Sequence, residues 1–185
     1  MIIGFQGIKN SYNDFATDIF IERLKIRDVE KFPLVISKNV AKSLIDKEID
    51  FGVIAIKNNI AGIVKESENI MKSNLFQVVD TIEIKINHCL FVFDENSIKN
   101  LKTIASHPQA LKQCENYIKS YFPNCKLQEE LDTSKTAEDL KNGILSKSTG
   151  VICSEKAGIE NNLFLISKNI ANKTSKTTFY LIKLK

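Results

Sequence analysis

The stretch Phe51-Gly52-Val53-Ile54-Ala55-Ile56 is almost continuously apolar, and it decides the fold. A strand with one face in water alternates apolar and polar residues, whereas a strand that is buried on both faces has an unbroken apolar run. We therefore predict that residues 51–56 form an inner strand of a parallel sheet with helices packed on both faces. The fold class that follows from this arrangement is α/β.

Short apolar runs alternate with helical patterns on both sides of this strand. The predicted strands cover residues 2–5, 33–36, 89–93, 101–104, 126–131, 150–153 and 178–184, with a long extended stretch over residues 75–86. The predicted helices cover residues 13–26, 40–48, 108–121 and 136–145. Sheets in such folds bind ligands at the carboxyl ends of their strands, so we expect the functional residues there.

The composition excludes several classes of protein. The chain has 185 residues, of which 43% are hydrophobic, and its seven glycines and three prolines are too few for a disordered or collagen-like protein. This length can bury a core without disulfides or metals. The net charge is +4, but only Arg23 and Arg27 among the 26 basic residues are arginines, and the lysines are mixed with acidic residues. We therefore predict no nucleic-acid partner.

The cysteine pattern argues against a metal site. The four cysteines stand far apart in the sequence, at Cys89, Cys114, Cys125 and Cys153. None is spaced like a metal ligand, and their apolar surroundings predict free thiols in a reducing compartment, with no metal and no cofactor. The sequence shows no signal-peptide pattern and no apolar run near the ~20 residues that span a membrane, so we expect a cytoplasmic protein without a membrane partner.

Two predicted helix starts are candidate anion sites. Ser106-His107-Pro108-Gln109-Ala110-Leu111 follows a predicted strand, and Ser106 with Gln109 forms a capping-box pattern. The second start is Asp132-Thr133-Ser134-Lys135-Thr136-Ala137-Glu138, where hydroxyls can cap and Lys135 could face an anion. Free backbone N–H groups at a helix start bind carboxylates or phosphates, but capping alone also explains both sequences, and both interpretations stay open.

A third candidate follows the central strand, where Lys57, Asn58 and Asn59 crowd together before Gly62. The same residues also make an ordinary turn. None of the three stretches contains paired carboxylates. They therefore favour a small anionic ligand over a metal ion or a glycosidic bond.

Taken together, these stretches resemble the catalytic domain of prephenate dehydratase. The segment from Ser106 to Leu111 is similar to that family's Ser-His-Pro-Gln-Ala-Leu motif, and His88-Cys89-Leu90 is similar to its His-Cys-Leu strand. The opening Phe5-Gln6-Gly7 and the hydroxyl-rich segment from Thr133 to Glu138 also resemble family motifs, so the resemblance covers essentially the whole chain. It implies contacts with the substrate from Lys57, Asn58, Asn59, Ser106, His107, Gln109, Ser134, Thr136 and Ala137.

The resemblance also implies an architecture and a reaction. The fold would have two α/β lobes similar to type II periplasmic binding proteins, with the ligand cleft between them. Residues 1–80 with 165–185 would form one lobe, and residues 81–164 the other. The expected substrate is prephenate, a small dicarboxylate that loses water and carbon dioxide to give phenylpyruvate in phenylalanine biosynthesis. The resemblance suggests a homodimer or larger homo-oligomer, and we do not expect the family's regulatory ACT domain in this polypeptide.

Two departures from the family motifs bear on the function. The family's Pro-Ile-Glu-Asn-Ser becomes Ala55-Ile56-Lys57-Asn58-Asn59, and its Thr-Arg-Phe falls at residues 176–180, where the arginine has no match. The catalytic threonine of the motif aligns with Thr177 or with Thr178. We predict that the lost arginine is linked to Lys57, with Lys135 and Lys176 as further candidate cations.

Three functions are therefore open. The first is a prephenate dehydratase. The second is a catalytically degenerate protein whose cleft binds a small carboxylate. The third is an enzyme that acts on arogenate, or that decarboxylates prephenate without dehydrating it.

Overall fold

The computed structural model describes residues 1–25 and 27–185, and it divides into two compact α/β units, as the sequence predicts in outline. Unit 1 comprises Met1–Lys85 with Ser175–Lys185, and unit 2 comprises Ile86–Thr174. The boundaries between these two units differ from the predicted lobe boundaries, after residues 80 and 164, for two reasons. Strand β5 runs unbroken over Phe76–Ile86, and strand β10, Phe164–Ser167, pairs with β6 in the sheet of unit 2.

Unit 1 contains a mixed sheet of six strands in the order β2-β1-β3-β11-β5, with the short β4 on β3. Its strands are β1 Ile2–Phe5, β2 Glu30–Pro33, β3 Phe51–Asn58, β4 Gly62–Ile63, β5 Phe76–Ile86 and β11 Ser175–Leu184. Strand β1 runs parallel to β2 and to β3, and its pairing with β3 agrees with the prediction that residues 51–56 lie in a parallel sheet. Strand β11, however, runs antiparallel to β3. The prediction of an all-parallel sheet is wrong on this side, because β11 enters the sheet at the end where β3 finishes.

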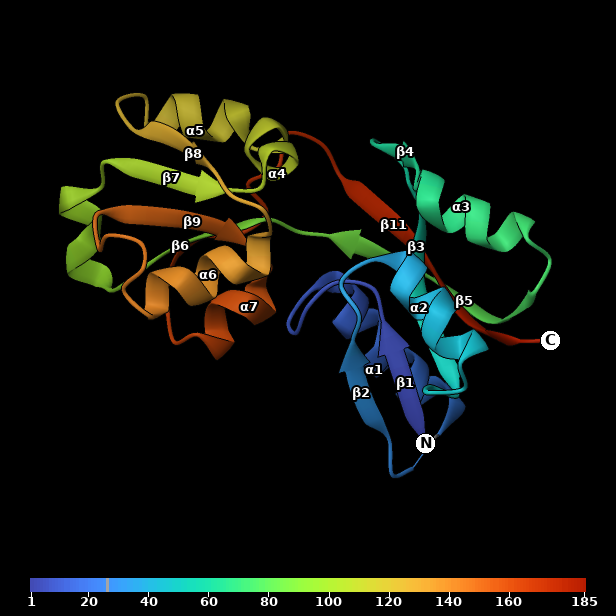
Figure 1. Ribbon diagram of the computed structural model, residues 1–185. Coiled ribbons are helices and arrows are strands. Elements are labelled where there is room, and N and C mark those ends of the chain that lie inside the picture. The colour runs from blue at the N-terminus through green and yellow to red at the C-terminus, as the bar shows by residue number, and fades with distance from the viewer. Residues whose placement is uncertain (26) are drawn as a thin grey trace. The chain divides into compact units, whose positions relative to one another are not determined.

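Helices cover both faces of this sheet (Figure 1). They are α1 Tyr12–Leu24, α2 Ser37–Ile45 and α3 Lys65–Lys72. On one face Phe20 of α1 packs with Val53 and Phe179, and on the other Val40 of α2 packs with Ile54. The burial of β3 on both faces confirms the prediction made from its apolar run.

Unit 2 contains a five-stranded sheet in the order β10-β6-β9-β7-β8. Its elements are β6 Cys89–Val92, η1 Glu95–Asn100, β7 Thr103–Ser106, α4 Pro108–Gln113, α5 Glu115–Tyr121, β8 Lys126–Glu129, α6 Thr133–Lys141, β9 Thr149–Cys153, α7 Glu155–Glu160 and β10 Phe164–Ser167. Leu111 and Ile118 of α4 and α5 pack on one face of the sheet, and Ala137 and Ala157 of α6 and α7 pack on the other (Figure 1).

Several predicted elements shift or divide. The strand predicted at 33–36 is wrong beyond Pro33, because Val35 takes a left-handed φ of 63° that a strand cannot contain. The helix predicted at 108–121 is two helices that break at Cys114. Helix α1 matches the prediction for residues 13–24, whereas the predicted last residue, Ile26, lies outside the described residues. Elements α3, α7, β4, β10 and η1 were not predicted.

Candidate functional site

Three polar side chains meet where β3 ends beside the start of β11. The Asn58 amide nitrogen donates hydrogen bonds to Ser175 Oγ and to Thr177 Oγ1, each at 2.9 Å. Ser175 and Thr177 are buried, and both lie on the same side of β11 because side chains two residues apart on a strand share a face. The carboxyl end of β3 therefore carries an ordered amide and hydroxyl cluster, which we call the Asn58 cluster (Asn58, Ser175 and Thr177).

The orientation of the Asn58 amide follows from its other contacts. Its carbonyl oxygen accepts from the backbone N–H groups of Ile60 and Ala61, each at 2.9 Å, so the nitrogen is the atom that faces the hydroxyls. A hydroxyl has one hydrogen to donate and two lone pairs to accept with. Since Thr177 Oγ1 accepts from Asn58, its own hydrogen is available to donate to another group.

The strand register separates the two candidate threonines. Thr177 stands directly opposite Asn58, whereas Thr178 stands directly opposite Lys57. Neighbouring residues on a strand point to opposite faces, so Lys57 and Thr178 lie on the face of the sheet away from the Asn58 cluster. If the motif threonine aligns with Thr177, the missing arginine falls at position 178, and the two departures from the family motifs are then cross-strand neighbours.

The other candidate cations already have partners. Lys176 Nζ lies 2.7 Å from Glu83 Oε1, and Lys135 Nζ lies 3.0 Å from an oxygen of Asp139. The backbone N–H of Lys176 donates to Asn59 Oδ1 at 2.7 Å, so Asn59 ties β11 to the end of β3. No ion pair of Lys57 occurs within residues 1–25 and 27–185, and its side chain is exposed.

In unit 2 the predicted capping box at Ser106 is wrong. Ser106 is the last residue of β7, it is fully buried, and its hydroxyl donates to the carbonyl oxygen of Ile152 at 2.6 Å. The residue that caps α4 is His107, whose Nδ1 accepts from the N–H of Gln109 at 3.2 Å. The strand extends two residues further than predicted and takes Ser106 with it.

The start of α6 is also capped by a residue other than the predicted one. A carboxylate oxygen of Asp132 accepts from the N–H groups of Ser134 and Lys135, at 2.7 and 3.0 Å. The hydroxyl of Thr136 donates to the Asp132 carbonyl at 2.6 Å, and Ala137 is buried in the core. The Asp132 carboxylate thus occupies N–H groups that an external anion would use.

His88 joins the sheet of unit 2 to α4. Its Nε2 lies 2.8 Å from Gln113 Oε1, and burial lowers the pKa of the imidazole. The four cysteines are free thiols, as predicted, and burial raises the pKa of Cys114 to about 12 and also raises that of Cys89. Within the described part of the chain, no cluster of His, Cys, Asp and Glu could hold a metal ion, and no helix is long and apolar enough to cross a membrane.

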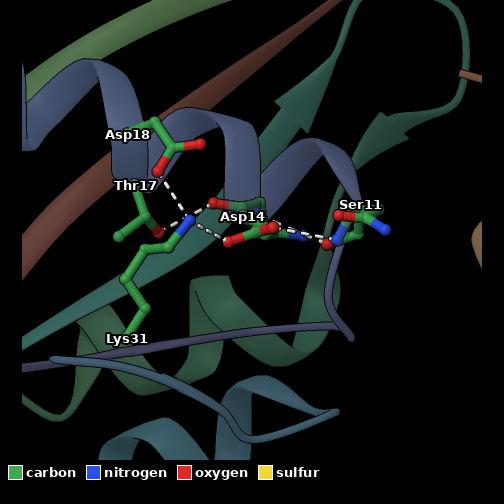
Figure 2. A network of polar contacts seen from close by, with 7 residues as sticks. Ser11, Asp14, Thr17, Asp18 and Lys31 are labelled. Atoms are coloured by element: carbon green, nitrogen blue, oxygen red, sulfur yellow. Dashed lines mark hydrogen bonds and ion pairs between the residues drawn. The ribbon is translucent and has the colours of Figure 1, made fainter. Parts of the chain in front are cut away.

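A second polar network ties α1 to β2 (Figure 2). The ammonium of Lys31 lies 2.6 Å from the buried carboxylate of Asp14 and 2.5 Å from Asp18. Burial by itself lowers the pKa of Lys31, but the hydrogen bonds that its ammonium donates to Asp14 and Asp18, with the attraction of their charges, outweigh burial and raise that pKa overall. The N–H of Asn10 donates to the other Asp14 oxygen at 2.8 Å, so this network fixes the loop before α1.

A comparison with protein families places this fold and these motifs among known proteins. The family model described as prephenate dehydratase matches residues 3–185. The chain belongs to the prephenate dehydratase family. The resemblance to this family that the sequence shows is therefore confirmed.

Individual relatives agree. The chain is 30% identical over 180 residues to a bifunctional chorismate mutase/prephenate dehydratase of Buchnera aphidicola subsp. Schizaphis graminum, covering 96% of this chain and 46% of that protein. It is 35% identical over 135 residues to a prephenate dehydratase of Methanocaldococcus jannaschii, covering 71% of this chain and 47% of that protein. The chain thus spans about half the length of the curated relatives it matches.

A solved structure shares the fold. The prephenate dehydratase of Arthrobacter aurescens in complex with L-Phe superposes with a TM-score of 0.85 at 17% sequence identity. The match covers all of this chain and 61% of that one. At this identity the similarity shows the fold alone.

Sequence reasoning did not single out Ser175 as a member of the Asn58 cluster. Ser175 lies two residues before Thr177, and the period of two along a strand is the signal that could have found it. The interactions of Gln6, whose side-chain oxygen accepts from the N–H of Ala55 at 3.1 Å, were also not predicted. This bond attaches the family's opening motif to the strand that carries Asn58.

Proposed function

We propose that this chain catalyses the prephenate dehydratase reaction, in which prephenate loses water and carbon dioxide to give phenylpyruvate. The observation that carries the proposal is the Asn58 cluster, because it positions the hydroxyl of Thr177 at the end of the central strand. Membership of the family supports the same reaction. The proposed substrate is a dicarboxylate, and the reaction needs no metal or cofactor.

The reaction requires the protein mainly to orient the substrate and to assist the departure of its ring hydroxyl group. The ring C–O bond breaks and the hydroxyl leaves as water, while the bond from the ring to the carboxylate breaks and its electron pair completes the aromatic ring. Prephenate dianion and one proton give phenylpyruvate anion, carbon dioxide and water. A positioned group that assists a leaving hydroxyl contributes typically about 10² to 10⁴-fold to the rate.

We propose that Thr177 gives this assistance. Its hydroxyl hydrogen is available, and its oxygen is held by Asn58, which fixes the side chain before the substrate arrives. Thr178 stands opposite Lys57 on the other face of the sheet. The proposal therefore assigns the role to Thr177 of the two threonines that the sequence leaves open.

A cation is needed near the substrate because prephenate carries two negative charges. We propose that Lys57 provides this charge from the opposite face of the sheet, near the end of β3, through its electrostatic field and not through direct contact with the substrate. Lys57 is the cross-strand neighbour of Thr178, the position where the family motif has arginine, so the two exchanges keep a positive charge at adjacent positions of the same sheet face. Contacts of the substrate with Asn59, Ser106, His107, Gln109, Ser134, Thr136 and Ala137 stay predictions, as do the cytoplasmic location and the homo-oligomeric state.

The test is turnover of prephenate by the native chain and by matched threonine variants. We expect phenylpyruvate to form with the native chain, Thr177→Val to lower kcat by about 10² to 10⁴-fold, and Thr178→Val to stay within a few fold. A reaction without protein corrects for the spontaneous decomposition of prephenate. Valine preserves the shape of threonine and replaces its hydroxyl with a methyl group.

The other outcomes identify the alternatives. No product from the native chain, with prephenate still raising the melting temperature, would show a binding protein without catalysis. Turnover of arogenate alone, or a decarboxylated product other than phenylpyruvate, would show a different substrate or outcome. A larger loss in Thr178→Val than in Thr177→Val would overturn the assignment of Thr177.

A further inference from the structure

The outer edge of strand β8 is a second feature of the fold, and the proposed reaction does not explain its function. In the order β10-β6-β9-β7-β8 this strand pairs only with β7, and no other strand covers its free side within the residues that the structure describes. All four of its residues, Lys126 to Glu129, are exposed. An uncovered strand edge is a template for pairing with another chain.

The backbone hydrogen bonds show which groups point outward. The N–H groups of Lys126 and Glu130 donate to Lys102 and Ser106 on the β7 side, at 2.9 and 3.0 Å. Because N–H and C=O directions alternate along a strand, Leu127 and Glu129 direct their backbone groups to the free side. An incoming strand would therefore bond to these two residues.

An apolar groove of about 700 Å³ lies beside this edge. It is formed by α4, α5 and β8, and its apolar lining includes Leu111, Ile118, Phe122, Pro123 and Leu127. Leu127 is 53% exposed, and Leu131, just after the strand, is 96% exposed. An almost fully exposed leucine beside an apolar groove gains burial when another chain covers both.

We propose that the β8 edge is an interface between two copies of this chain, which pair antiparallel about a twofold axis at Gln128. A twofold axis perpendicular to the sheet keeps each face on the same side in both copies, so odd-numbered residues must stand opposite odd-numbered residues. In this register Leu127 exchanges both backbone hydrogen bonds with Glu129 of the second copy. Glu129 does the same with Leu127 of the second copy.

The charges select this register from its neighbours. Lys126 comes to stand opposite Glu130 of the second copy, and the symmetry repeats this ion pair, while Gln128 faces its own equivalent. A shift of one step in one direction would place Lys126 opposite Gln128. A shift in the other direction would place Glu129 opposite itself, which is unfavourable because opposed like charges destabilise a strand pair. That shift would also place Lys126 opposite Asp132, but Asp132 lies beyond the strand and its carboxylate already accepts from the N–H groups of Ser134 and Lys135.

The exposed leucine fits the same arrangement. Continuing the register, Leu131 stands opposite Cys125 of the second copy, on the face of the sheet where the groove lies. By symmetry each copy contributes one Leu131 and one groove. The interface thus combines four backbone hydrogen bonds, two ion pairs and two buried leucines.

Sedimentation over a range of protein concentrations tests the proposal. We expect a monomer–dimer equilibrium in the native chain, with Glu130→Lys and Lys126→Glu each raising the dimer dissociation constant about tenfold or more, since each substitution affects two pairs. The exchanged variant Lys126→Glu/Glu130→Lys restores the native value. Within one copy these residues are four apart on a strand and do not meet, so restoration reports pairing between copies. Lys99→Glu serves as the control for net charge.

Cross-linking tests the register separately from the fold and from catalysis. Gln128→Cys places two thiols at a pair without backbone hydrogen bonds, where the Cα atoms lie about 4.5 Å apart and a disulfide fits. We expect Gln128→Cys to form a covalent dimer with oxidised glutathione, and Leu127→Cys to form much less. A native chain that stays monomeric at every concentration, a dimer indifferent to Glu130→Lys, or equal cross-linking of the two variants would overturn the proposal.

Discussion

The substitution Lys57→Glu tests whether Lys57 compensates for the missing arginine of the family motif. Lys57 stands opposite Thr178, so a carboxylate at position 57 would bring a negative charge to the end of β3 where a positive charge is proposed to attract the substrate through its field. We expect kcat/KM for prephenate to fall, with the loss appearing mainly in KM. Adding Thr178→Arg to this variant recreates the arrangement of the family and should recover most of the loss.

The expected magnitude follows from the exposure of Lys57. Two unit charges about 8 Å apart, on opposite faces of one sheet, interact by about 0.5 kcal/mol in water and about 2 kcal/mol near a protein surface of lower dielectric. The exposed side chain of Lys57 favours the lower figure. Reversing the charge doubles the effect to about 1 kcal/mol, or about 5-fold in kcat/KM, and Lys57→Met should cost about half of that free energy.

The assay is initial-rate formation of phenylpyruvate at several prephenate concentrations. Lys38→Glu, on the exposed surface of α2, makes the same change in net charge and controls for general attraction of the substrate. Lys57→Glu with the kinetics of the native chain would refute the role of Lys57. Equal losses in Lys57→Glu and Lys38→Glu would refute it as well, since the effect would then come from net charge.

Two further predictions concern stability. Lys31→Met should lower the free energy of unfolding, measured in urea, by about 2–3 kcal/mol, because the Asp14 carboxylate, 2% exposed, loses its ammonium partner. Asp18→Asn should lower it by less than about 0.5 kcal/mol. Similar losses of stability in both variants would contradict the network in Figure 2. Burial lowers the pKa of His88, so the unfolded chain binds more protons than the folded one just below pH ~6.5, and stability should fall as the pH decreases through this range. Melting temperatures against pH should fall less steeply in His88→Asn, and parallel curves would contradict the argument.

The sequence predicted those parts of the fold that depend on a local pattern of apolar and polar residues. The unbroken apolar run of β3 and its burial on both faces agree, because burial on two faces leaves no polar position for alternation to show. Helix α3 was not predicted, since half of its residues Lys65–Lys72 are charged and its two hydrophobic residues, Ile70 and Met71, are only partly buried against the core.

The errors at the candidate site come from contacts between distant residues. Ser106 matches a capping box locally, but its hydroxyl is taken by the carbonyl of Ile152, 46 residues away, and no local pattern carries that information. The two threonines could not be separated by sequence for a similar reason. Their difference lies in the register of β11 against β3, which sets Thr177 against Asn58.

The course of the chain also sets an order of assembly during synthesis. Unit 2 is one continuous segment, whereas unit 1 is interrupted by it and includes strand β11, from Ser175 to Leu184. The ribosome releases all of unit 2 before it releases β11, so unit 2 has the chance to fold while the sheet of unit 1 still lacks the strand beside β3. Thr177 joins Asn58 only after β11 has emerged. The emerging protein therefore acquires its proposed catalytic hydroxyl together with the strand that closes the exposed edge of β3.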